Sequence, residues 1–517
     1  MSVVVAEWRP VEACLLQQAL RLTNEAFAAR LGSAARTIAK WHANPAMRLT
    51  LDMQQALDTM LERATEEQRL RFTRLVAPPW EKQPEHREPW RRRLNADGDV
   101  ASALDCLDGI RQEPPGTTRR DVEELLCDGG AERLQARVRA RGSLDRAVVA
   151  DIVRHFYSTS PAGFGTVVLT LPGIREATTL VARDAWLDPR LDLESGSQGF
   201  QLVHELPSVE VPKTPSLIQA ATLRLAEILL ARTRFVDAPV YRMVRRPGEG
   251  GVVGAQFALD TFARYGLTWN LLEAEVCDLA LGLRDNLPLR ELLLPSATAV
   301  LEPASRICVG GAQALCAFAR PPEGDAPADY LLLVQERSPQ VVNATGRLAA
   351  IPKCFHQPIN DATRDLGLGR TMMRELEEEL FGRDELDAGR GGNTIADPMH
   401  PSRLSPPMRW LVGSHRWGME GTGFGFNLTT GNYEYAALIA VHDEDFWNRF
   451  GGVIETNWES SRLRTLSSRD GPGIAAVMRE PGWSDEGLVA FALGLKRLAE
   501  LDPERVVLPP FEIGVET

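Results

Sequence analysis

Apolar residues recur at helical spacing in the first third of the chain. Residues 10–65 and 98–160 place apolar side chains three and four positions apart, which predicts consecutive short helices. From residue 164 the pattern changes to stretches rich in Val and Thr, at 164–173 and 177–187, and these predict β-strands. The chain is therefore expected to change from helical to mixed structure near residue 160.

Helices and strands alternate in the middle of the chain. Thr214 followed by Pro215 is a typical helix start and predicts a helix over 215–233. The segment 238–246 has the pattern of a strand, and 255–266 has the pattern of a helix. Together these segments predict a mixed α/β region.

The C-terminal part of the chain has the clearest elements. Two apolar runs, 306–320 and 329–338, predict paired strands, and 424–442 predicts two more. A helix is expected over 371–382, and a last helix over 485–501. This order of elements predicts an α/β fold.

The predicted elements divide the chain into four parts. A loop rich in proline and charged residues, at 77–93, marks the boundary after the first part. We expect a multidomain α + α/β protein. Its parts are an all-α N-terminal domain (1–75), a helical linker region (76–160), a mixed α/β domain of unassigned role (161–299) and a C-terminal α/β domain (300–517).

Composition narrows the class of protein. A chain of 517 residues with 44% hydrophobic and 25% charged residues is typical of globular domains. The net charge of −12 excludes a globally basic nucleic-acid coat, but not one small DNA-reading module, because binding depends on local charge. Seven scattered cysteines without a CxxC pair indicate reduced thiols in the cytoplasm and no zinc cluster. We expect no membrane association, because the start is not a signal peptide and no stretch approaches the roughly 20 apolar residues of a span.

The N-terminal segment "LTNEAFAARLGSAARTIAKWHA" has a specific rhythm over 22–43. Thr23 can cap a helix, Ala28 is small where another helix must approach closely, and Gly32 suits the left-handed residue of a tight turn. A second helix is expected to follow at 34–43. Two helices joined by such a turn form a helix-turn-helix.

These residues resemble the Cro/repressor-type family of DNA-binding domains over 10–65. The resemblance implies double-stranded DNA as partner, a homodimer on a two-fold site, and the second helix in the major groove. Arg36 would then contact a guanine and Lys40 a phosphate. The residues expected to face DNA are Ala34, Ala35, Arg36, Thr37 and Lys40. His42 stands where the family often has Glu, and a helical hairpin used for protein contacts is the alternative.

The segment "TMMRELEEELFG" at 371–382 concentrates negative charge. On a helix, Glu375 lies on the same face as Glu378 and Glu379, because residues three and four apart are neighbours. Three close carboxylates can hold a divalent cation such as Mg²⁺, which bridges to diphosphate oxygens. The alternative is a solvated acidic helix, with Arg374 offsetting part of the charge.

The surrounding sequence resembles the Nudix family over about 300–460, whose box contains R-E-U-x-E-E with U apolar. The matching residues are Arg374, Glu375, Leu376, Glu378 and Glu379. The resemblance implies an α/β/α sandwich that binds a nucleoside diphosphate linked to another group. In that family the three glutamates hold Mg²⁺ and are catalytic in active members. Arg374, Pro352 and Trp417 are the expected ligand-binding residues.

Three positions depart from the Nudix pattern. Leu366 stands where the first glutamate of the box is expected, Cys354 replaces a glycine, and Phe381 takes a later glycine position. The loop that wraps the pyrophosphate is therefore altered. A degenerate box of this kind favours ligand binding over efficient hydrolysis.

Three functions follow from these patterns. The first is a DNA-binding transcriptional regulator that senses a nucleotide-type metabolite through its Nudix-like domain. The alternative is an active, Mg²⁺-dependent Nudix hydrolase of a nucleoside diphosphate derivative, recruited by its N-terminal helices. A scaffold with neither property would leave both sets of residues unexplained.

Overall fold

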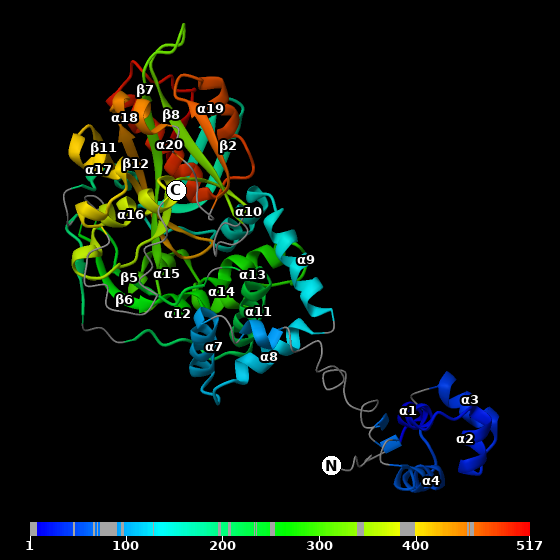
Figure 1. Cartoon of the computed structure of the whole chain (residues 1–517). Helices are drawn as coiled ribbons and strands as arrows, with labels where there is room; N and C mark the ends of the chain where they lie inside the picture. The colour runs from blue at the N-terminus through cyan, green and yellow to red at the C-terminus, as the bar shows by residue number, and fades with distance from the viewer. Residues whose placement is uncertain are drawn as a thin grey trace. The chain divides into compact units, whose positions relative to one another are not determined.

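A computed structural model gives the fold of the chain (Figure 1). The structure describes residues 8–44, 47–65, 68–69, 71–72, 90–94, 98–127, 129–194, 198–204, 208–231, 233, 235–248, 254–338, 346–382, 399–451, 454 and 460–517. Most of the predicted proline-rich loop at 77–93 lies outside the described residues. The chain divides into two compact units, residues 1–93 with 126–130, and residues 94–125 with 131–517.

The N-terminal unit is helical where it is described. Its helices are α1 (Pro10–Leu20), α2 (Asn24–Leu31), α3 (Ala35–Ala43) and α4 (Leu51–Glu62). Their apolar faces share one core, in which Trp8, Phe27, Ile38 and Trp41 are at most 2% exposed. Ile38 and Trp41 stand three apart on α3, so one face of this helix is buried and the other is left to solvent.

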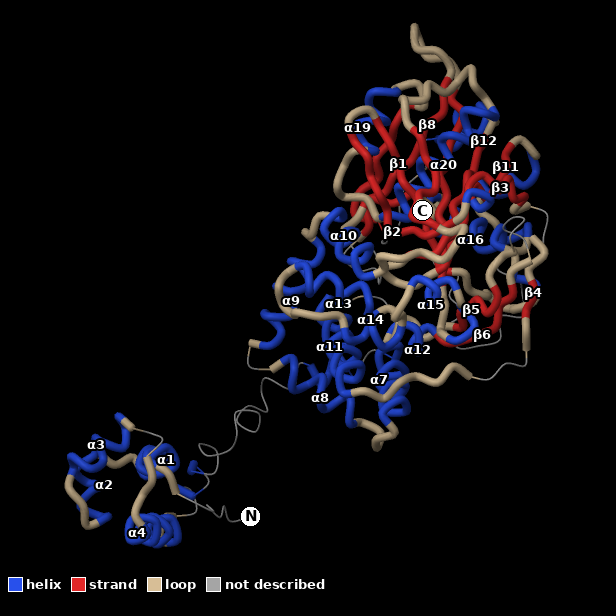
Figure 2. The backbone as a smooth tube through the Cα atoms, turned by 180° about the vertical axis from the view of Figure 1, so that it is seen from behind, coloured by secondary structure: helices blue, strands red, loops and turns tan. Residues whose placement is uncertain are grey.

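Helices of the second unit precede its strands and lie between them along the chain. They are α7 (Gly98–Arg111), α8 (Thr117–Leu126), α9 (Gly130–Gly142), α10 (Arg146–Phe156), α11 (Pro215–Ala231), α12 (Phe262–Gly266), α13 (Leu271–Ala280), α14 (Pro288–Leu293), α15 (Ala297–Leu301), α16 (Leu368–Leu380), α17 (Pro406–Ser414), α18 (Glu444–Phe450), α19 (Gly471–Met478) and α20 (Asp485–Leu501). Short 3₁₀ turns lie at Asp184–Trp186, Pro303–Ser305, Arg364–Leu366 and Pro401–Arg403. Helices α7, α11, α13 and α14 gather together at one end of the large sheet (Figure 2).

Eleven strands of the described residues form one mixed sheet. Its main path is β13-β8-β7-β12-β11-β2-β1-β14, with β10, β9 and β3 pairing to β7, β8 and β11. The strands are β1 (Gly165–Leu171), β2 (Ile174–Ala182), β3 (Leu187–Asp192), β7 (Gly310–Arg320), β8 (Asp329–Arg337), β9 (Leu348–Ala350), β10 (Lys353–Phe355), β11 (Trp417–Asn427), β12 (Tyr433–Val441), β13 (Ser460–Ser467) and β14 (Glu512–Glu516). β12 runs parallel to β7, and the other paired strands of this sheet are antiparallel.

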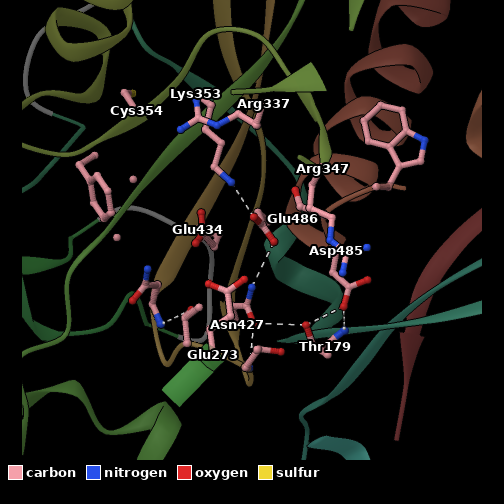
Figure 3. A pocket seen from close by; sticks show the side chains of 18 of the residues that line it. Thr179, Glu273, Arg337, Arg347, Lys353, Cys354, Asn427, Glu434, Asp485 and Glu486 are labelled. Carbon is pink, nitrogen blue, oxygen red and sulfur yellow. Dashed lines mark hydrogen bonds and ion pairs between the residues drawn. The ribbon is translucent and has the colours of Figure 1, made fainter. Parts of the chain in front are cut away.

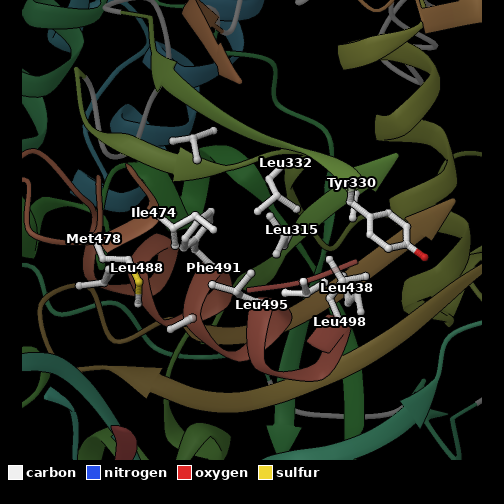
Figure 4. Packing of buried hydrophobic residues seen from close by; sticks show 14 of the residues in the cluster. Leu315, Tyr330, Leu332, Leu438, Ile474, Met478, Leu488, Phe491, Leu495 and Leu498 are labelled. Atoms are coloured by element: carbon white, nitrogen blue, oxygen red, sulfur yellow. The ribbon is translucent and has the colours of Figure 1, made fainter. Parts of the chain in front are cut away.

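Successive side chains of β7 point to opposite faces of the sheet, and helices cover both faces. Leu315 packs with Phe491 and other side chains of α20 in one buried cluster (Figure 4). Phe318 points to the other face, where its ring stacks on Phe446 of α18 with centroids 5.6 Å apart. Helix α16 also contacts β7. Because both faces are covered, these strands are nearly continuous apolar runs.

The mixed α/β class is confirmed by this architecture. Strands from 161–299 and from 300–517, which the sequence pattern separates, join the same sheet where β2 pairs with β11. Among the described residues, no helix is long and apolar enough to cross a membrane.

A second sheet corrects one predicted helix. Its strands are β4 (Gln201–Leu202), β6 (Gln256–Thr261) and β5 (Pro239–Arg245), in that order. The helix expected over 255–266 is wrong in its first half, because this segment pairs antiparallel with β5, and only α12 is helical. Pairing with a neighbouring strand overrides local helical spacing.

Candidate DNA-facing helix and ligand pocket

The first candidate site is the outer face of α3 in the N-terminal unit. Thr23 accepts a hydrogen bond from the Ala26 amide (3.2 Å) and begins α2, and Gly32 ends it with φ of 67°. The turn is therefore built as the sequence predicts. The structure places Ala34, Arg36 and Lys40 on the exposed surface, with Ala35 and Thr37 half-buried beside them.

A polar contact fixes α3 against the preceding helices. Gln17 of α1 is 6% exposed, and its amide nitrogen donates to the Leu22 carbonyl (3.2 Å) and to Asn24 Oδ1 (2.8 Å). Its oxygen lies 3.0 Å from His42 Nε2 at the end of α3. His42, which departs from the family pattern, thus takes part in holding the three helices together.

The second candidate site is a pocket of about 190 Å³ in the second unit. It lies at the end of the large sheet, beside the first turn of α20 (Figure 3). Its walls come from β2, α10, α13, β7, α16, the segments 353–357 and 427–434 and the start of α20, together with Arg337 and Arg347. Most lining residues are polar or charged, and they come from segments that are far apart in the chain.

Two glycines shape the floor of this pocket. A Cβ at Gly310 would lie 1.9 Å from the Tyr433 carbonyl oxygen, and a Cβ at Gly311 would lie 1.7 Å from that of Cys354. Only glycine allows β10 and β12 to approach β7 so closely at this point. The close approach brings the start of β12 and the start of β10 to the same cavity.

A buried ion pair holds the start of α20 against the opposite wall. Asp485 Oδ1 lies 2.7 Å from Arg146 Nη1, and its Oδ2 accepts from the amide (2.9 Å) and the hydroxyl (2.7 Å) of Thr179. Arg146 also binds Glu176 at 2.6 Å. Arg146 and Asp485 are 7% and 6% exposed, so this network links α10, β2 and α20 through side chains that are largely shielded from water.

A second pair crosses the cavity itself. Lys353 Nζ donates to Glu486 Oε1 at 2.6 Å, and Asn427 Nδ2 donates to the other oxygen at 3.2 Å. Burial alone would disfavour the charge of Glu486, but Lys353 holds the pKa of this carboxyl below its usual range. Glu486 therefore stays ionised inside the pocket.

Two further carboxylates line the pocket without a partner among the described residues: Glu434 at the start of β12 and Glu273 of α13. Burial and the neighbouring Glu486 raise the pKa of Glu434 to about 8. The same two causes raise the pKa of Glu273. At neutral pH this wall of the pocket can therefore hold a proton and offer both donor and acceptor atoms.

The predicted acidic helix is buried. Glu375, Glu377, Glu378 and Glu379 of α16 are 6%, 0%, 8% and 0% exposed, so the interpretation as a solvated acidic face is wrong. The carboxylates instead pack between strands and loops, where backbone and side-chain donors reach several of their oxygens, although Glu377 Oε2 is buried and accepts no hydrogen bond in the described parts of the chain.

These carboxylates point to different partners. Arg374 donates to Glu375, which lines the pocket. Glu379 accepts from the Lys353 amide (3.0 Å) and from Gln335 Nε2 (3.3 Å), and Glu377 accepts from the Ser405 amide (2.9 Å).

The carboxylates of α16 do not form a ready metal site. No group of three or more His, Cys, Asp or Glu in the described parts of the chain is placed to hold a metal ion. Binding of Mg²⁺ by Glu375, Glu378 and Glu379 stays a prediction, and no chemical step is derived through it.

The expected ligand-binding residues are only partly brought together. Arg374 is 4% exposed and supports Glu375, while Pro352 directly precedes the pocket residue Lys353 and its carbonyl accepts from the Ala314 amide (3.0 Å). Trp417 pairs with Val441 at the opposite end of β11 from the pocket residue Asn427. Trp417 is therefore not part of this cavity.

The most informative pocket residues were not among the sequence candidates. Glu434 and Glu486 each carried a weak signal, because each is a charged residue next to an apolar run, in "YEYAALIAV" and "DEGLVAFAL". A carboxylate in a strand that is otherwise buried on both faces needs a polar neighbour or a cavity. Glu273 shows no comparable signal.

Comparison with known proteins adds no further assignment: the chain matches no protein-family model and shows no significant similarity to a curated protein.

Proposed function

We propose that the protein is a ligand-responsive, DNA-binding transcriptional regulator that senses a nucleotide-type metabolite. The observation that carries the proposal is the outer face of α3, which follows a tight turn at Gly32 and exposes Arg36 and Lys40 beside small residues. Small side chains allow a helix to lie deep in the major groove, and the two cations supply base and phosphate contacts.

The proposed DNA-bound form is a homodimer on a two-fold operator. A single short helix contacts only a few base pairs, so two copies spaced by one helical turn of DNA would supply the affinity that one lacks. The net charge of −12 disfavours contact between DNA and other parts of the chain, and so favours contact through α3.

The proposed sensing site is the pocket beside α20. Its unpaired carboxylates, its cations and its single Glu375 from the Nudix-like helix supply polar groups that converge on one cavity, as small-molecule sites do. Ligand can change DNA affinity only as far as it binds two states of the protein differently, which typically gives a change of about 5- to 150-fold.

The test of DNA reading starts with selection of a binding site from random-sequence duplex DNA. Arg36→Ala should weaken binding to the selected site by about tenfold and relax its specificity, because one bidentate contact to guanine is lost. Arg63→Ala, which removes an exposed arginine at the end of α4, is the charge-matched control. Equal affinity of wild type and Arg36→Ala for the selected site would remove the DNA-reading assignment.

The second candidate function is hydrolysis of a nucleoside diphosphate derivative. It is favoured by Glu375, which lines the pocket at the end of a helix face that resembles the Nudix box. If the protein is an active hydrolase, Glu378→Gln should abolish Mg²⁺-dependent release of nucleotide products. A wild-type protein that binds such compounds without releasing products would support sensing alone.

A further inference from the structure

Neighbouring strands place polar side chains on one face of the large sheet, at the wall of the pocket beside α20. In the register of the sheet, Lys353 of β10 lies opposite Gln313 of β7, and Gln313 lies opposite Ala436 of β12. Glu434 stands two residues before Ala436 on the same strand and so points to the same face. Leu315 of β7 shares this face with Gln313 and packs against α20. Glu434 therefore lies between the sheet and the start of α20.

Glu434 lies among other carboxyl groups. Glu486 of α20 and Glu273 of α13 line the same cavity, and Figure 3 shows the three side chains around it. Lys353 reaches this wall from β10, but its ammonium group lies 2.6 Å from Glu486 and is paired with that carboxylate. Glu434 has no hydrogen bond or ion pair in the described parts of the chain. An ionised Glu434 would therefore add a negative charge to a wall that already holds one carboxylate.

Burial and these neighbours favour the neutral form of Glu434. Burial and then Glu486 raise the pKa of Glu434 to about 8, with Lys353 opposing the rise and Glu273 adding to it. The pKa of Glu273 is also raised, by burial and by Glu486, against the opposing charges of Lys353, Arg347 and Arg224. At neutral pH this wall thus carries a carboxylic acid at Glu434, which has a proton to donate.

The other side chains around Glu434 do not change this balance. Its partners in the sheet do not titrate, because they are Gly311 of β7 and Gly425 of β11. The pKa of Tyr433, which precedes it on β12, is raised well above its usual value by burial, so this phenol stays neutral. Glu375 of α16 also lines the cavity, but Arg374 donates to it.

A buried amide beside Glu434 lacks a partner. Gln313 is 1% exposed, and among the described residues neither its nitrogen nor its oxygen makes a hydrogen bond. It lines a small cavity of about 10 Å³ that shares Glu434 and Glu486 as walls with the pocket. Leaving a buried amide unpaired is costly. The Gln313 amide can donate to Glu434, directly or through the one water that this cavity admits, while the Glu434 proton is donated to a ligand.

We propose that Glu434 binds an anionic oxygen of the ligand as a neutral carboxylic acid, so that the ligand and one proton occupy the pocket together. This inference rests on the proposed function, which makes the ligand a nucleotide and therefore an anion, and it adds a dependence on pH. An ionised Glu434 would instead repel the ligand. Two like charges about 8 Å apart, at the effective dielectric constant of a protein surface, weaken binding by about tenfold or more.

Isothermal titration calorimetry of ADP on the full chain measures this coupling at pH 7.5 and pH 9. Phosphate groups, whose second pKa is about 6, stay ionised over this range. Because Glu434 loses its proton near pH 8, the Kd for ADP should rise by about fivefold or more between the two pH values. At pH 8, where half of the free protein holds the proton, binding should take up about half a proton per ADP. The dependence of the measured enthalpy on the ionisation enthalpy of the buffer counts these protons.

A variant that cannot titrate assigns the proton to Glu434. Glu434→Gln keeps a donor at this position, so its Kd for ADP should be the same at pH 7.5 and pH 9. An amide donates more weakly to an anion than a carboxylic acid does, so the variant should bind ADP about threefold more weakly than wild type at pH 7.5. At pH 9 the order should reverse. Glu512→Gln, an exposed substitution on β14, is the matched control and should keep the wild-type pH dependence.

The outcomes separate this inference from the proposed function. A Kd for ADP that is equal at pH 7.5 and pH 9 in wild type, or an unchanged pH dependence in Glu434→Gln, would overturn the role of Glu434 and leave nucleotide sensing in place. No binding of ADP at either pH would overturn both.

Discussion

Replacing Asp485 by Asn tests how the start of α20, and with it the pocket, is held in place. The wild-type carboxylate accepts from Thr179 twice and pairs with Arg146 at 2.7 Å, and both charged residues are at most 7% exposed. Asparagine keeps the shape and one acceptor but removes the negative charge. Among the described residues, Arg146 then retains only Glu176 as a charged partner, and that side chain is 24% exposed.

The size of the effect follows from burial. Removing one partner of a buried ion pair costs about 3–5 kcal/mol, because the other charge stays in a poorly solvated site. We expect about 3 kcal/mol for Asp485→Asn, at the lower end, because Glu176 still compensates part of the charge. The free energy of unfolding of the second unit should fall by this amount.

Urea unfolding measures this loss when it is followed by tryptophan fluorescence, since Trp483 is fully buried next to Asp485. The matched control is Asp151→Asn on α10, whose carboxylate is 79% exposed and lies 3.7 Å from Arg154. That surface pair should contribute at most about 1 kcal/mol. If Asp485→Asn unfolds within about 0.5 kcal/mol of the control, the network does not hold α20 as described.

Two further predictions concern Glu434 in the wall of the pocket and the packing of α20 on the large sheet. Burial beside Glu486 raises the pKa of Glu434 from 4.5 to about 8. Between these two pH values the folded chain still holds a proton that the unfolded chain has released, so the stability of the wild type falls as the pH rises. Glu434→Gln should therefore gain stability relative to wild type by about 1.4 kcal/mol per pH unit between pH 5 and 7.5 in urea unfolding, and a pH-independent difference would contradict the shift. A Cβ on Gly494 of α20 would lie 2.8 Å from Leu315 Cβ, so Gly494→Ala should lower the melting temperature despite its better helix propensity. Gly109→Ala in α7, where nothing lies within 4 Å of the added methyl, should leave the melting temperature unchanged or raise it, and equal effects of the two substitutions would refute tight packing at α20.

Elements with a strong local pattern were predictable from the sequence. The helix at 485–501 has the predicted bounds, because its apolar stripe and the Ser484 cap agree with each other. The strands at 310–320 and 433–441 lie within the predicted segments, since long runs of apolar residues in a sheet covered on both faces leave few alternatives. The segment 256–261 was misassigned, because its partner strand and not its own spacing decides its conformation.

The pocket could be predicted only in small part. Glu375 was predicted from a sequence motif. Glu273, Glu434 and Glu486 lie on three separate segments that only the folded sheet and α20 bring together. The burial of all four glutamates on α16 was also hidden, because charge spacing alone resembles a solvated helix. Long-range contacts of this kind are a property of the topology and leave no local pattern.

The central claim is that occupancy of the pocket changes DNA binding by α3. The most direct measurement is fluorescence anisotropy of the full chain on its selected operator, with and without a saturating concentration of ADP, at one fixed salt concentration. The account predicts that ADP changes the Kd for DNA by at least about fivefold. Glu434→Gln should reduce this change, and Arg36→Ala should abolish both the change and specific DNA binding. A Kd for DNA that is the same with and without bound ADP would contradict the account.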